Sequence, residues 1–217
     1  MTMEVVATMT ATEAFRDRLA ACDAWGHPAV GPEWIEQVEA RLPPGVRTAV
    51  ARAAASDCLV TVDGHRFRLE GLAPGKGPYA FFSRSQRQVP APNWEYFVQI
   101  AEYDRVRRAM AGADLRVDFE DELMDISVRD GGTLLWCIEV KERAGDLDAL
   151  LAGITSYAGV ADDAPDRGND ALRKAKYLQR QRPPWFSLVG IGRRLDFSVE
   201  HGGGAGFRLV PDVVPVG

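Results

Sequence analysis

The sequence predicts a mixed α/β protein in which a sheet of mixed strand orientation is preceded by a helical and hairpin extension. Two observations carry this prediction. Helical and strand-like periodicities alternate from Asn93 onward, and Gly and Pro concentrate in residues 71–92, just before that change. We therefore expect two parts, residues 1–92 and residues 93–217, with the second forming the main core.

Residues 1–92 are expected to form three short helices followed by a β-hairpin. The second helix would begin at Pro32, a favourable first helical residue, and the third covers the alanine-rich residues 46–55. The dipeptide Asp63-Gly64 lies between two β-prone runs and is typical of a type I′ turn. We interpret this part as an accessory or dimerisation region, so a homodimer is a predicted assembly.

The second part follows the order helix, three strands, two helices and two strands. Its first helix should begin after Asn93 and run to about Met110, with Trp94 and Phe97 on its apolar face. The remaining elements are expected as strands at 115–119, 123–128 and 134–140, helices at 147–157 and 171–180, and strands at 186–191 and 195–199.

Composition limits the partners and the compartment. The 217 residues include 26 Lys and Arg against 31 Asp and Glu, and the net charge of −5 excludes a basic coat over the whole chain. The three cysteines are far apart and form no CxxC pair, which argues against a disulfide framework or a thiolate zinc site. No signal peptide or membrane-spanning run is recognisable, so we expect a cytoplasmic protein without a membrane partner.

The chemistry concentrates at the end of the predicted strand 134–140. Glu139 and Lys141 are two residues apart, so a strand would place both on one face. If the preceding hairpin is centred on Gly132, Asp125 falls opposite Glu139. If the centre lies between Gly131 and Gly132, Asp125 faces Ile138 instead. The sequence leaves both registers open.

Two neighbouring carboxylates need a proton or a cation between them, because like charges about 4 Å apart repel by roughly 4 kcal/mol at an effective dielectric near 20. Mg²⁺ suits two carboxylates and a backbone carbonyl, for which Val140 is the candidate. A metal-activated water could then attack a phosphodiester, with Lys141 beside it to orient or deprotonate the water. The pattern therefore favours a phosphodiesterase site formed by Asp125, Glu139 and Lys141.

These residues resemble the PD-(D/E)XK, or restriction-endonuclease-like, nuclease superfamily. Asp125 corresponds to the first acid of the family, and Glu139-Val140-Lys141 corresponds to its E-x-K, whereas Met124 replaces the usual proline. The resemblance implies a restriction-endonuclease-like core of helix, three-stranded meander, helix and strand on a mixed sheet.

The resemblance also implies a function and further ligands. It implies a nuclease that binds one or two Mg²⁺ ions, which Mn²⁺ can replace, and hydrolyses nucleic acid, most simply DNA. Many members add a glutamate from the helix before the meander. Glu102 is the first candidate for this role and Glu95 the second. The alternative is a catalytically inactive protein of the same fold that acts as an interaction or regulatory module, with the charges serving only as a salt bridge at a strand end.

The predicted helix 171–180 is basic and could contact phosphates locally despite the acidic chain. Its candidate nucleic-acid contacts are Arg173, Lys174, Lys176 and Arg180. A solvated helix face is the other interpretation of this pattern.

Overall fold

The computed structural model describes residues 56–63, 66–70, 72, 75–83, 91–161, 163–166, 168–202 and 206–214, together with isolated positions before Ser56. The three helices predicted before residue 56 fall outside the described ranges. The chain divides into two compact units, Met1–Asp104 and Arg105–Gly217. We predicted the boundary after residue 92. The division instead falls inside α4 (Trp94–Ala109), the helix predicted to follow Asn93.

The first unit contains a three-stranded antiparallel sheet of β1 (Leu59–Asp63), β2 (Arg66–Leu69) and β3 (Tyr79–Ala80). The first two strands form the predicted hairpin, whereas β3 was not predicted. Phe67 is buried, and its ring lies 4.4 Å from that of Phe81 and 5.5 Å from that of Tyr96 (centroid distances). Aromatic packing therefore holds this small sheet against the start of α4.

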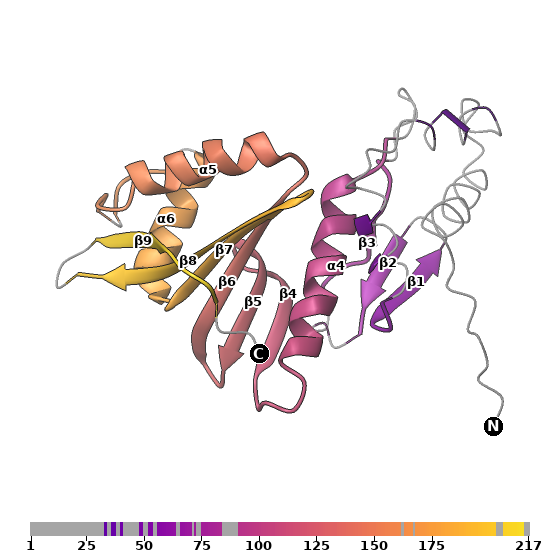
Figure 1. Ribbon diagram of the computed structural model, residues 1–217, viewed down its shortest axis with the longest axis horizontal. Helices are drawn as coiled ribbons and strands as arrows, with labels where there is room; N and C mark the ends of the chain where they lie inside the picture. The colour runs from indigo at the N-terminus through magenta and orange to yellow at the C-terminus, as the bar shows by residue number, and fades with distance from the viewer. Residues whose placement is uncertain are drawn as a thin grey trace. The chain divides into compact units, whose positions relative to one another are not determined.

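The second unit is built on a six-stranded sheet in the order β4-β5-β6-β7-β8-β9 (Figure 1). The first three strands form an antiparallel meander, β6 pairs with β7 in parallel, and the last three strands are antiparallel. Helices α5 and α6 connect the parallel pair, as a crossover requires. The bounds are β4 (Arg116–Asp121), β5 (Met124–Asp130), β6 (Thr133–Lys141), α5 (Ala144–Ser156), α6 (Asp170–Gln181), β7 (Trp185–Gly190), β8 (Arg193–His201) and β9 (Phe207–Pro211).

The two helices cover one face of this sheet and close a hydrophobic core against it. Leu147 and Ile154 of α5 pack with Leu178 of α6 and with sheet residues that include Cys137 and Leu188. The mixed α/β class predicted from the sequence is thus confirmed, and every element predicted after Asn93 is present. β9 is an additional strand. None of the described helices has both the length and the apolarity needed to cross a bilayer.

The β5–β6 hairpin contains both of the registers that the sequence left open. Next to the turn, Asp130 pairs with Thr133 across the loop Gly131-Gly132, which is the register centred between the two glycines. The register shifts after this, and from Val128 paired with Trp136 onward the strands follow the register centred on Gly132. Leu135 is the extra residue of this β-bulge.

The bulge also explains an irregularity in the alternation of faces. Leu134 and Cys137 belong to the same core under the helices although they are an odd number of residues apart on one strand. Strict alternation would place them on opposite faces. The extra residue between them restores the common face.

Candidate active site

Glu139 lies near the end of β6, on the face that α6 covers, and only 1% of it is exposed. Its two carboxylate oxygens contact two different lysines. Lys141 Nζ lies 2.7 Å from Oε1, and Lys174 Nζ of α6 lies 2.7 Å from Oε2. The predicted common face of Glu139 and Lys141 is therefore present, and a third charged group from a distant part of the chain joins it.

Asp125 lies beside this group on β5. In the shifted register Ile126 pairs with Ile138, so the next step along the strands brings Asp125 opposite Glu139. The Asp125 Oδ2 accepts a hydrogen bond of 2.5 Å from the backbone N–H of Val140. Burial, followed by the negative charge of Glu139, raises the pKa of Asp125 well above its ordinary value, although the Val140 N–H and both lysines oppose this.

Lys174 is the residue whose place the sequence did not indicate. It is 6% exposed, and its ammonium donates to the Leu123 carbonyl at 2.8 Å as well as to Glu139. Asp170 Oδ1, one helical turn earlier, lies 3.6 Å away. We predicted Lys174 as an exposed nucleic-acid contact, and its burial corrects this, because the Nζ faces the sheet rather than solvent.

The other basic residues of α6 divide between buried and exposed positions. Lys176 is also buried, and its ammonium donates to the Ala164 carbonyl, so it too lies away from the surface where we predicted it. Arg173 has 43% of its side chain exposed and pairs with Asp166 at 3.9 Å, and Arg180 is exposed. Contact with a nucleic acid stays a prediction for these two arginines.

A second buried polar group lies beside the first on the same face of the sheet. Arg129 donates from Nη2 to Asp121 Oδ2 at 2.8 Å and to the Tyr177 hydroxyl at 3.2 Å. Ser127 Oγ donates to the same Asp121 oxygen at 2.6 Å. Burial and the charge of Asp121 raise the pKa of Tyr177. These contacts fix α6, and with it Lys174, over β5 and β6.

The donor set of the site fits a hard divalent cation. Asp125 and Glu139 supply carboxylate oxygens, the ligand type that Mg²⁺ and Mn²⁺ prefer, and the negative charge of Glu139 acts on Asp125. Among the described residues of 105–217, no third acid, His or Cys joins them in a compact group of ligand atoms. The Val140 carbonyl stays a predicted ligand.

Glu102 and Glu95 lie on the part of α4 that belongs to the first unit. Glu102 is 7% exposed, and Glu95 is partly buried. Their assignment as further ligands stays a prediction from the resemblance.

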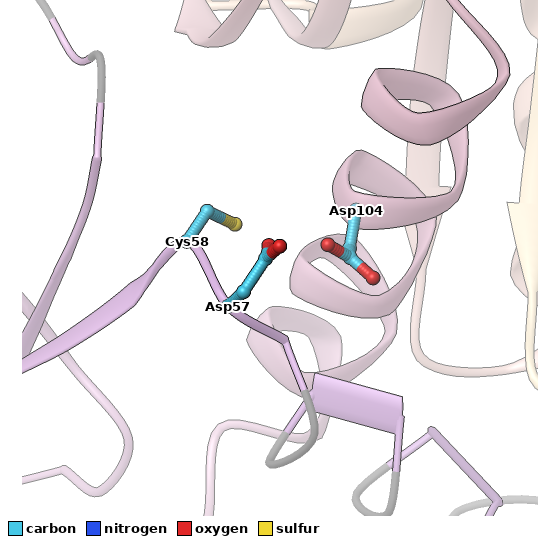
Figure 2. A group of neighbouring side chains, drawn as sticks. All are labelled: Asp57, Cys58 and Asp104. Carbon is cyan, nitrogen blue, oxygen red and sulfur yellow. The ribbon is translucent and has the colours of Figure 1, made fainter. Parts of the chain in front are cut away.

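The first unit contains a different group of ligand-type side chains, which the sequence did not suggest. Asp57, Cys58 and Asp104 point toward one another, and their ligand atoms all lie within 4.8 Å of one another (Figure 2). Asp104 comes from α4, far along the chain from the other two. The Cys58 thiol is buried and also contacts Ser56 Oγ at 2.9 Å.

Comparison of the chain with protein-family models, with curated proteins and with solved structures finds no match. The chemistry of the site therefore rests on its own geometry.

Proposed function

We propose that this chain is a divalent-cation-dependent nuclease that hydrolyses phosphodiester bonds of DNA, with a restriction-endonuclease-like core. The observation that carries the proposal is the juxtaposition of Asp125 and Glu139 across the β5–β6 pair, with Lys141 on Glu139. Along the chain, α4, the antiparallel meander β4–β6, the helices α5 and α6 and the parallel strand β7 follow in the order helix, meander, helix and strand that the family resemblance implies.

The roles follow from the chemistry of each group. Asp125 and Glu139 would hold the cation, which when bound supplies neutralising charge for the phosphate and acidifies a water. Lys141 has 22% of its side chain exposed, so its ammonium can reach the substrate side of the site, orient the attacking water and stabilise the charge that develops on the phosphate. The water oxygen bonds to phosphorus and releases a proton to solvent, the bond from phosphorus to the leaving oxygen breaks, and the leaving oxygen takes up a proton from solvent.

A second candidate is a noncatalytic protein of the same fold that acts as an interaction or regulatory module. It is favoured by one observation: both oxygens of Glu139 are paired with lysines, and the residue is almost fully buried. In that case the three charged groups form a structural ion cluster.

Incubation of the purified protein with supercoiled plasmid, single-stranded DNA and RNA, each with Mg²⁺, Mn²⁺ or EDTA, separates the two candidates. We expect cleavage of DNA with either metal and none with EDTA. Glu139→Gln and Lys141→Met should each lower the rate on the order of 100-fold or more, since each removes a group that acts on the reacting atoms.

Glu200→Gln is the matched control, because Glu200 is an acid of the same unit whose ion pair with Arg208 is exposed. It should keep the wild-type rate. Cleavage that survives both Glu139→Gln and Lys141→Met would show that the site is assigned wrongly. Absence of cleavage of all three substrates would favour the noncatalytic candidate.

A further inference from the structure

The ammonium of Lys174 lies among oxygens from three separate segments. The Leu123 carbonyl precedes β5, Glu139 Oε2 belongs to β6, and Asp170 Oδ1 lies at the start of α6, at 2.8, 2.7 and 3.6 Å from Nζ. Two carboxylates and one backbone carbonyl form the kind of oxygen environment that a hard divalent cation takes in proteins. Here a side-chain cation of the protein occupies it.

The two lysines on Glu139 differ in how firmly they are held. Lys141 is on the same strand, with 22% of its side chain exposed, and can swing toward solvent. Lys174 has only 7% of its side chain exposed, and its withdrawal would leave both a buried carboxylate oxygen and the Leu123 carbonyl without their donor. The Lys174 ammonium therefore stays on Oε2 of Glu139, whereas the Lys141 ammonium can leave Oε1.

We propose that Lys174 is a built-in cation of this site that takes the place of a second divalent ion. The site then accepts a single divalent cation rather than two, held by Asp125 and by the Oε1 side of Glu139, where Lys141 lies. This inference rests on the proposed function, which identifies the one bound ion as a divalent metal. It adds the role of Lys174 and the number of ions that the site binds.

The test counts bound Mn²⁺ by electron paramagnetic resonance of the free ion during titration of the full-length protein. All variants carry Asp104→Asn, which removes one ligand of the separate group formed with Asp57 and Cys58. We expect one bound ion with Lys174 present and two in Lys174→Met. Lys174→Gln is a second neutral variant whose amide can still donate to the Leu123 carbonyl, and it should also bind two.

Lys176→Met is the matched control, because Lys176 is a buried lysine of the same helix whose ammonium donates to the Ala164 carbonyl. It should bind one ion, like the protein with Lys174 and Lys176 intact. Thermal unfolding followed by near-ultraviolet circular dichroism identifies any variant that does not fold. The number of ions bound with Lys174 present is measured without any substitution in the site.

The outcomes separate this inference from the proposed function. The inference would be overturned if the protein with Lys174 bound two ions. It would also be overturned if that protein and the folded variants Lys174→Met and Lys174→Gln all bound one ion. Either result would leave the nuclease proposal standing. No ion with Lys174 but one in Lys174→Met would overturn the count of one ion that this inference assigns and would contradict a metal-dependent activity. No ion in any protein would overturn both.

Discussion

The ion pair of Glu139 and Lys174 can be tested by a double-mutant cycle built from Glu139→Gln and Lys174→Met. Glu139 is 1% exposed, the Lys174 side chain is 7% exposed, and the charged atoms lie 2.7 Å apart. Removal of one partner of a buried pair costs about 3–5 kcal/mol, because the other charge stays buried without compensation. The pair should therefore be strongly coupled.

The contacts set where each variant falls in that range. Lys174→Met leaves Lys141 on Glu139, so we expect a loss of about 3 kcal/mol in the free energy of unfolding, the lower end of the range. Glu139→Gln leaves two ammonium groups without their carboxylate and should cost about 4 kcal/mol. The double variant should lose about 5 kcal/mol rather than the sum, which is a coupling energy of about 2 kcal/mol.

Urea unfolding followed by tryptophan fluorescence, with linear extrapolation to water, measures each free energy. The exposed pair of Glu200 and Arg208 is the reference cycle, since its atoms are as close, at 2.5 Å, but its side chains are 54% and 73% exposed. Its coupling should stay within about 0.2–1 kcal/mol. A coupling for the buried pair no larger than that of the exposed pair would refute the reasoning, because burial would then add nothing to the interaction.

Three further predictions concern the surroundings of the site. The raised pKa of Asp125 means that the folded state retains a proton that the unfolded chain releases, so the free energy of unfolding falls as pH rises from the unfolded pKa to the folded pKa. The slope is at most about 1.4 kcal/mol per pH unit. Asp125→Asn should remove it, as measured by urea unfolding across that pH range. Gly153→Ala should lower the thermal midpoint, because its Cβ would meet a side-chain carbon of α6 at 2.7 Å and overpacking costs about 1–3 kcal/mol, whereas Gly145→Ala, with nothing within 4 Å, should not lower it. Ser187→Ala should cost about 1–3 kcal/mol in urea unfolding, because the buried Trp136 Nε1–H loses its acceptor at 2.9 Å, and an unchanged stability would contradict this.

The alternation of apolar and polar residues was sufficient to predict the strands β4 to β8 and the helices α5 and α6 of the second unit. It worked there because β6 and β7 are central, buried strands and α5 and α6 present a clear apolar face to them. It failed for β9, whose residues Phe207–Pro211 include an arginine and a proline and are held in the sheet by pairing with β8. It also missed β3, which is only two residues long.

The site was predictable only in its local part. Glu139 and Lys141 share a face because they are two residues apart on one strand, and the sequence pattern predicts that strand. The partner of Asp125 depended on a bulge at Leu135 that no local pattern indicates. Lys174 could not be placed, because a lysine on a basic helix is ordinarily exposed, and here carbonyl and carboxylate oxygens of distant segments hold it inside.

The bulge at Leu135 separates the geometry of the turn from the geometry of the site. The pairing beside Gly131-Gly132 follows one register and the pairing beside Asp125 follows the other, with the change absorbed by a single residue. The loop can therefore be replaced by another two-residue hairpin turn, or carry a short inserted epitope, while Asp125 keeps its partner. Without the bulge, in contrast, a regular ladder continued from the turn would pair Val128 with Leu135 and bring Ile138 in place of Glu139 beside Asp125.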